Sequence, residues 1–302
     1  MSAGDRWELI RALGAVADDP ADARKVLATL GLDAAGLTNA EHTEVFVLNC
    51  PPYASVYLGA EGGLGGEAAD RVAGFYRAIG LAPPASDADH LTALLSLYAA
   101  LGEDRSSVSA AITTQTDKRS WNHVRQALFW EHLWPWLPGY LGAVTDVGVP
   151  TLSAWAELTM QVLVAEQATI SADVPLPVAL RAAPPPLTGE ESVGELLDAL
   201  IAPIRSGMII TRRALAIGAG QADVGHRIGE RRFTLRAMLD QEPERTFGWL
   251  ADEAERWSAR HAASALGDPV RHWWAERART TATVLRPSVA LAPQAAGDTA
   301  QP

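Results

Sequence analysis

A chain of 302 residues that is 48% hydrophobic is long enough for one large or two modest domains with a real core. Its net charge of −11 and pI near 5.1 argue against a general nucleic-acid binder and against attachment to an anionic membrane surface. The single cysteine, Cys50, excludes an intramolecular disulfide and any paired-cysteine metal or redox motif, and without a signal peptide or a long apolar run we expect a cytoplasmic protein.

Apolar residues recur at helical spacing along most of the chain, and the alternation typical of strands is nearly absent. Prolines and glycines mark where helices stop, notably at Pro51, Pro52, Gly80 and Gly102. In the first half, helices are predicted over 5–16, 21–30, 39–50, 66–79, the leucine-patterned stretch that ends at 101, 120–132 and 151–171.

The composition changes at 173–187, where five prolines and almost no charge indicate a linker or a wrapping arm. Helices are predicted to resume at Thr188, which forms a capping box with Glu191. Further helices are predicted over 211–218, 230–239, 243–265 and 268–281.

The predicted fold class is therefore all-α, a helical bundle with an extra helical C-terminal extension. We expect the tail from 286 onward to be disordered, because it is rich in proline, alanine and glycine. The predicted organisation is a helical core over 1–172, a Pro-rich linker over 173–187, a helical region with a basic patch over 188–285 and the tail over 286–302.

The stretch Ser86-Asp87-Ala88-Asp89-His90-Leu91 places an acid beside a histidine at the predicted start of a helix. Ser86 and Asp89 fit a capping box, in which the serine oxygen accepts a first-turn amide and the carboxylate reaches back to the amide of Ser86. Capping does not explain His90, because a cation is mildly disfavoured at that end of a helix. The residues alone leave both helix capping and recognition open.

Aromatic residues are dense in the segment that ends in a Trp-Pro-Trp corner, and we expect most of them to pack in the core, with a remainder that could line a groove for an apolar peptide. They are Trp121, Phe129, Trp130, Trp134, Trp136 and Tyr140. His90, His123 and His132 form no histidine pair at metal-ligand spacing, and the glycines over 59–66 lack a P-loop lysine. We therefore expect no catalytic residue, no metal site and no cofactor.

The region over 205–236 is locally basic, and its two short helices joined by a glycine turn resemble a helix-turn-helix in outline. A DNA-binding regulator is the alternative hypothesis for this chain. The net acidity of the whole chain favours a solvated basic face, or one docked on the acidic body, so a nucleic-acid partner is unlikely.

Four sequence blocks occur in the order found in one protein family. They are Pro52-Tyr53-Ala54-Ser55-Val56-Tyr57-Leu58, Phe75-Tyr76 with Gly80-Leu81, Ser86-Asp87-Ala88-Asp89-His90-Leu91, and Glu131-His132-Leu133-Trp134-Pro135-Trp136. In these blocks, over residues 40–170, the chain resembles the TorD/DmsD family of cytoplasmic chaperones for redox enzymes exported by the twin-arginine route. The glutamate and proline of the family's Glu-Pro-x-Asp-His signature stand here as Ser86 and Asp87.

The resemblance implies an all-helical chaperone, not an enzyme, with two subdomains that meet near the Asp-His pair. Such a chaperone binds the twin-arginine leader or the apo form of a molybdenum-containing oxidoreductase subunit, aids cofactor insertion and prevents premature export. It does not insert into a membrane. Some members of the family bind guanine nucleotide, for which no motif is present here.

The peptide-binding residues that the resemblance and the chemistry together suggest are Tyr53, Tyr57, Tyr76, Gly80, Asp89 and His90. The carboxylate of Asp89 would attract the guanidinium groups of a leader. The tyrosines would receive its apolar side chains in a helix-in-groove mode. His90 would tune the site through its charge or its hydrogen bonds.

Overall fold

The computed structural model describes residues 3–84, 87–103, 118–170, 174–225, 229–263 and 268–291. These residues form helices and no β-strand, which confirms the all-α fold, and their one extended pairing is an isolated bridge between Tyr53 and His90. None of the described helices is long and apolar enough to span a membrane. The chain divides into unit 1, Met1–Gly59 with Gly63–Arg181, and unit 2, Ala60–Gly62 with Ala182–Pro302.

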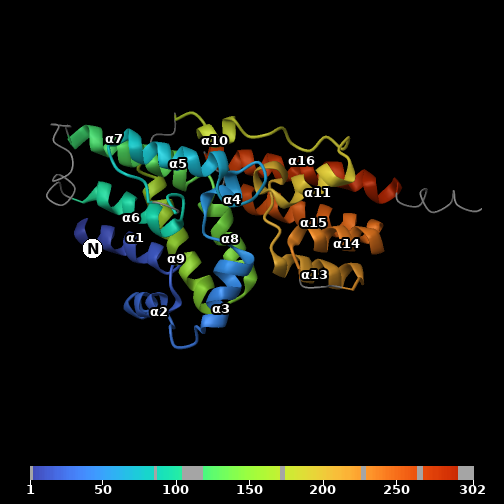
Figure 1. Ribbon diagram of the computed structural model, residues 1–302, viewed down its shortest axis with the longest axis horizontal. Helices are drawn as coiled ribbons and strands as arrows, with labels where there is room; N and C mark the ends of the chain where they lie inside the picture. Colours follow the sequence, from blue (N-terminus) through green and yellow to red (C-terminus); the bar gives the residue numbers. More distant parts are fainter. Residues whose placement is uncertain are drawn as a thin grey trace, which may run out of the picture. The chain divides into compact units, whose positions relative to one another are not determined.

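Unit 1 packs its N-terminal helix against a leucine-rich one, and Figure 1 shows α1 running beside α6. α8 and α9 form a second packed pair in the same unit. The elements of unit 1 are α1 (Ala3–Ala15), α2 (Pro20–Thr29), α3 (Asn39–Thr43), the π-helix η1 (Glu44–Asn49), α4 (Ala54–Leu58), α5 (Gly66–Ala78), α6 (Leu91–Gly102), α7 (Lys118–Leu128), the π-helix η2 (Phe129–Leu133), α8 (Leu137–Val147), α9 (Pro150–Gln167) and α10 (Val178–Arg181).

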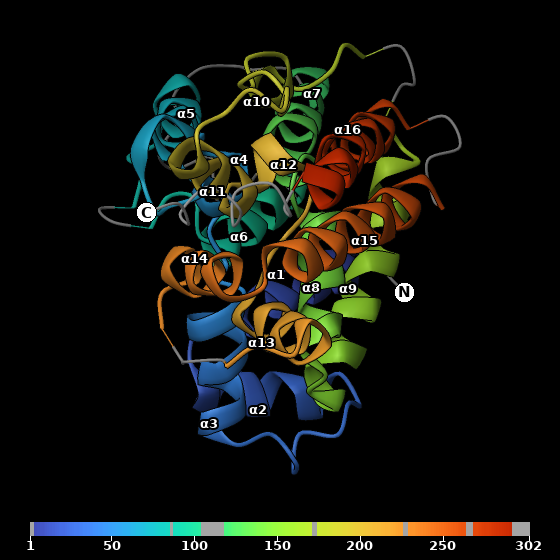
Figure 2. The same cartoon turned by 90° about the vertical axis from the view of Figure 1, so that its right-hand side faces the viewer.

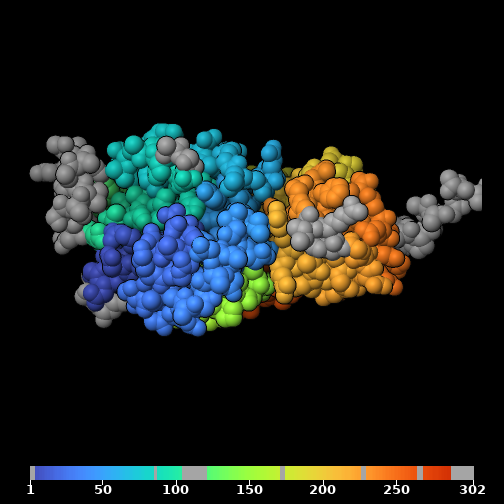
Figure 3. Space-filling model, turned by 60° about the horizontal axis from the view of Figure 1, so that its bottom comes forward, coloured from blue at the N-terminus to red at the C-terminus, as the bar shows by residue number. Residues whose placement is uncertain are grey.

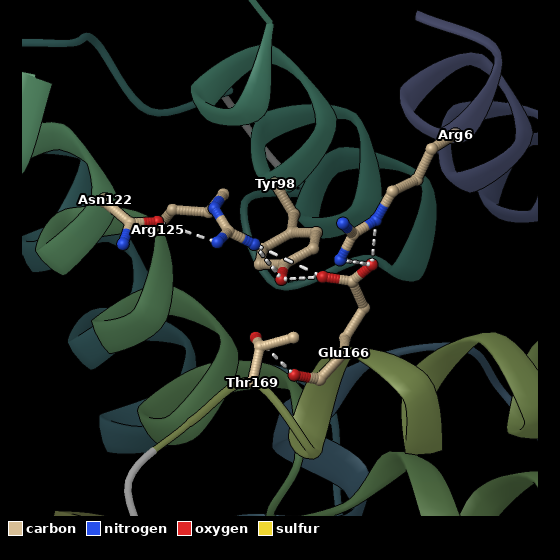
Figure 4. Close-up of polar contacts among 6 residues, drawn as sticks. All are labelled: Arg6, Tyr98, Asn122, Arg125, Glu166 and Thr169. Atoms are coloured by element: carbon tan, nitrogen blue, oxygen red, sulfur yellow. Dashed lines mark hydrogen bonds and ion pairs between the residues drawn. The ribbon is translucent and has the colours of Figure 1, made fainter. Parts of the chain in front are cut away.

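A buried ion network joins four helices of unit 1 around Glu166 of α9, whose exposed fraction is 1%. Oε1 of Glu166 accepts from Nε of Arg6 at 2.5 Å, and Oε2 accepts from the hydroxyl of Tyr98 at 2.6 Å (Figure 4). Nη1 of Arg125 donates to the same Tyr98 oxygen and to Oε2 of Glu166. The network therefore connects α1, α6, α7 and α9 through one carboxylate.

The Pro-rich segment attaches to unit 1 over its first part. Nε1 of Trp130 donates to the carbonyl oxygen of Pro175 at 2.9 Å, and a carboxylate oxygen of Glu131 accepts from the amide of Val178 at 2.7 Å. The segment also contains the short helix α10. The division between the two units falls after Arg181, inside the predicted linker.

Unit 2 is built on the consecutive helices α15 and α16, which pack on each other and lie side by side in Figures 1 and 2. α13 and α14 each pack on α15, and the surface of this region is the orange part of the space-filling view in Figure 3. The elements of unit 2 are α11 (Val193–Ile201), α12 (Pro203–Ser206), α13 (Arg212–Ala222), α14 (Arg231–Gln241), α15 (Pro243–Ala262) and α16 (Pro269–Leu291).

Two helix ends differ from the prediction. Oε1 of Glu191 accepts from the amide and the hydroxyl of Thr188, but the helix starts at Val193, where Ser192 and Glu195 form the capping box. α16 continues to Leu291, beyond the predicted end at 281 and into the predicted tail. An apolar stripe that extends to the buried Leu285 sustains this helix.

The packing of α13 on α15 depends on a missing side chain at Gly218. A Cβ atom there would lie 2.3 Å from Cε2 of the buried Trp249, whereas a Cβ at Gly220 of the same helix would meet no atom within 4 Å. Gly218→Ala is therefore expected to destabilise the protein by about 2 kcal/mol through overpacking. Gly220→Ala, the matched control, is expected to stabilise it by about 0.5–1 kcal/mol through helix propensity.

Urea unfolding of the two variants checks this expectation. Equal effects of the two substitutions would contradict the close contact between Gly218 and Trp249.

Candidate functional site

The starts of α4 and α6 cross in unit 1 and hold Tyr53 beside His90. The amide of Ala54 donates to the carbonyl of Asp89 at 3.0 Å, and the amide of Leu91 donates to the carbonyl of Pro52 at 2.8 Å. These bonds form the isolated antiparallel bridge. Residues from two sequence blocks 34 positions apart are thereby fixed in one place.

Asp89 has a structural task in this crossing. Its side chain is 3% exposed, and its Oδ2 accepts from the amide of Ser55 at 2.8 Å, in the first turn of α4. The carboxylate thus caps the helix that follows Tyr53. The predicted capping box with Ser86 is wrong for α6, because that helix begins at Leu91; Ser86 itself lies outside the described residues.

His90 is the N-cap residue of α6. Its Nδ1 accepts from the amide of Thr92 at 3.2 Å, so the neutral ring carries its proton on Nε2. Burial lowers the pKa of His90, which favours this neutral form, while Asp18, Asp87 and Asp89 act in the opposite direction. Nε2 of this buried ring has no hydrogen-bond partner among the residues that the structure describes.

Tyr53 is half-buried and forms the more accessible side of the site. Its ring meets the ring of His90 edge-on at 4.7 Å between centroids, and its hydroxyl donates to Oδ1 of Asp87 at 3.3 Å. Burial, and then Asp87, raise the pKa of Tyr53. Asp87 and Asp18 are both exposed, and both lie close enough to act on Tyr53 and His90.

The sequence did not point to Asp18 or Asp87. Asp18 follows α1 and has no motif around it, and only the packing of α1 on α6 brings it near His90. Asp87 stands where the resembled family has a proline. A signal for either residue would have required knowledge of the tertiary contacts.

Two of the predicted contact tyrosines lie in the core of unit 1. Tyr57 is 2% exposed, stacks on Trp136 with 5.4 Å between centroids and donates to the carbonyl of Pro51 at 2.9 Å. Tyr76 is buried and donates to the carbonyl of Ala93 at 3.2 Å; burial raises its pKa to about 12. Both support the helices that surround the site.

Gly80 ends α5 in the left-handed conformation, with φ of +79°. Its amide donates to the carbonyl of Arg77, and the next amide, of Leu81, donates to the carbonyl of Tyr76. This is a C-terminal capping arrangement that favours glycine. The position therefore has a conformational role that is independent of any ligand.

The aromatic corner is core, as predicted for most of its members. Phe129, Trp130, Trp134, Trp136 and Tyr140 are buried, and Trp121 is half-buried. His132 is half-buried with its ring against that of Phe75, and desolvation lowers its pKa to about 4. His123 is exposed on α7, and the described residues contain no group of metal-ligating side chains that could hold an ion.

The basic region forms two helices, α13 and α14, as predicted, but part of its charge is paired. Arg232 pairs with Asp198, and Arg236 pairs with Asp240. Binding to nucleic acid relies on arginines that neutralise phosphates. These pairs do not favour the DNA-binding alternative.

Unit 1 is thus a helical domain whose candidate site contains the hydroxyl of Tyr53, the ring N–H of His90 and exposed carboxylates. Such hydrogen-bonding groups suit the binding of a ligand. Residues 15–141 match a family model described as nitrate reductase delta subunit, a NarJ/TorD-type chaperone family. The match covers less than half of the chain and is consistent with the TorD/DmsD resemblance. Chaperones of this family partner with the catalytic subunits of molybdoenzymes.

The match ends within α8, so α9 and nearly all of unit 2 lie outside it. No curated protein matches the chain.

Proposed function

We propose that this protein is a cytoplasmic chaperone that binds the twin-arginine leader, and the apo catalytic subunit, of a molybdopterin oxidoreductase. It would aid cofactor insertion and prevent premature export. The family match over residues 15–141 supports the coarse assignment to molybdoenzyme maturation. The observation that carries the site is the unused Nε2–H of buried His90, set beside Tyr53 among exposed carboxylates.

The site suits an extended peptide that carries arginine. Guanidinium groups form strong, charge-assisted hydrogen bonds with carboxylates, and Asp87 and Asp18 are the exposed ones here. The Tyr53 ring offers a face on which a guanidinium or an apolar side chain can pack. The Nε2–H of His90 would donate to a backbone carbonyl of the leader.

The other predicted contact residues would support the residues that touch the leader without touching it themselves. Asp89 holds the start of α4 through Ser55, and Tyr57 and Tyr76 pack beneath the crossing. Gly80 shapes the end of α5. We therefore propose that Tyr53 and His90, with Asp87 and Asp18, touch the leader, and that the others position them.

Asp87→Asn is expected to weaken binding of a twin-arginine leader peptide by about tenfold, because one charge-assisted contact is lost. His90→Gln is expected to weaken it less, because only a neutral hydrogen bond is changed. Asp70→Asn, which removes the same charge from the exposed face of α5, serves as the matched control and should leave affinity unchanged.

Isothermal titration calorimetry with the leader of a molybdenum oxidoreductase, and with a leader whose two arginines are replaced by glutamines, measures these affinities. Equal leader affinity in Asp87→Asn, His90→Gln and the control would contradict the proposed site. Equal affinity for the two leaders would contradict recognition of the twin arginines.

A further inference from the structure

Unit 2 contains a tight crossing of α12 over α16. Gly207, which ends α12 with φ of +76°, approaches so closely that a Cβ atom there would lie 2.3 Å from the amide nitrogen of Ala278. The hydroxyl of Thr281 donates to the carbonyl of Ser206 at 2.8 Å. These contacts fix the position of Arg205 on α12 relative to Arg277 on α16.

Arg277 is a buried cation for which the described part of the chain supplies no ion pair. It is 9% exposed, its Nη1 donates to the carbonyl of Pro184 at 2.7 Å, and its guanidinium lies 4.5 Å from the centroid of the Trp273 ring. Burial and the nearby Arg205 lower its pKa to about 10. No carboxylate pairs with Arg277 among the residues that the structure describes.

Arg205 has even fewer partners. Its Nε is buried and has no hydrogen-bond partner, and the side chain forms no ion pair within the described chain. Hydrogen bonds from the side chain and the backbone of Ser192, and to a smaller extent the charge of Arg205, lower the pKa of Glu195. That carboxylate is already engaged, because Oε2 accepts from the hydroxyl and the amide of Ser192.

Arg205 and Arg277 act on each other electrostatically, and among the described residues the hydrogen bond that Arg277 donates to the carbonyl of Pro184 is the one found for the two guanidinium groups. Each guanidinium has five N–H donors and stays charged in proteins. Burying such cations is costly unless an opposite charge and further acceptors compensate. The charge that two arginines require is close to that of a phosphate group, about −1.5 to −2 at neutral pH, whereas a carboxylate supplies only one negative charge.

We propose that Arg205 and Arg277 form a binding site for a phosphate group, carried by a small molecule or as free phosphate. The guanidinium of Arg277 is held by Pro184 and Trp273, so its remaining donors are preoriented. Arg205 closes the site from α12. The site lies wholly within unit 2 and is separate from the Tyr53–His90 site.

Isothermal titration calorimetry of the full chain with inorganic phosphate, at constant ionic strength, tests the proposal. A saturable binding heat is expected, and Arg205→Gln is expected to raise Kd at least about tenfold. Arg236→Gln, which removes an exposed arginine paired with Asp240, is the matched control and should bind phosphate as the parent does. Phenyl phosphate distinguishes a site for a phosphate monoester from one that admits only the free ion.

The unfolding temperature of Arg205→Gln shows whether a loss of phosphate binding could result from misfolding of the variant. Without phosphate, Arg205→Gln should unfold at a higher temperature than the parent, because loss of the half-buried Arg205 charge relieves its repulsion with the buried Arg277. No saturable binding by the parent, or equal phosphate affinity in Arg205→Gln, would overturn the site. Acetate that binds as tightly as phosphate would overturn the ligand class.

Discussion

Glu166→Ala is expected to lower the free energy of unfolding of unit 1 by about 3–5 kcal/mol, because it leaves the largely buried Arg125 and the half-buried Arg6 without their counter-charge. Glu166 is 1% exposed and serves Arg6, Arg125 and the Tyr98 hydroxyl at once. Burial, and then the hydrogen bond to Glu166, raise the pKa of Tyr98, so this phenol stays a donor. Urea unfolding followed by circular dichroism measures the change.

The control for this prediction is an exposed pair in the same unit. Glu67→Ala breaks the contact between Glu67 and Arg71 on α5, where the glutamate side chain is 84% exposed, and should leave stability nearly unchanged. A double substitution, Glu166→Ala with Arg125→Ala, should cost less than the sum of the single changes, since each partner left alone is destabilising. Strict additivity would contradict the coupled network.

Asp89→Ala is expected to lower the free energy of unfolding by about 2–3 kcal/mol, because the amide of Ser55 loses a charged acceptor in a buried place. Asp89→Asn retains a neutral acceptor and should cost about half as much. Urea unfolding of both variants checks the order. A stability equal to that of the parent would contradict the capping role of this carboxylate.

The same two variants separate structure from recognition. If Asp89 acts only by holding the start of α4, Asp89→Asn should bind the leader nearly as the parent does at a temperature where it is folded. A loss of affinity in folded Asp89→Asn as large as that of Asp87→Asn would indicate that Asp89 contacts the leader directly. The Asp-His pair would then act as one binding unit.

The adjacent residues Asp89 and His90 have different roles in the structure, which the linear motif does not reveal. Adjacent residues in a signature suggest a shared task, yet Asp89 points its oxygen to Ser55 while His90 caps α6. The binding chemistry that remains is an N–H from His90 and carboxylates contributed by the loop and by the end of α1. Asp87 replaces the family's proline and adds one of these charges.

Helices with a clear apolar stripe were predictable from the sequence, and α8 shows where this failed. Pro138, Gly139 and Gly142 lower its helix propensity, so the sequence predicts no helix over these residues. Burial of Tyr140 and Leu141 in the core stabilises the helix in spite of this. α16 extends past its predicted end for the same reason, since packing overrides local composition.

The sequence by itself determined the helical class, the buried aromatic corner and the family resemblance, because each rests on local periodicity or on short residue blocks. Only the tertiary structure decided which carboxylates surround His90, that Asp89 caps another helix, and that Arg205 and Arg277 lie near each other with no ion pair in the described part of the chain. These facts depend on contacts between helices that are far apart in the chain. Local chemistry therefore identified the Asp-His pair, and packing assigned its two members different roles.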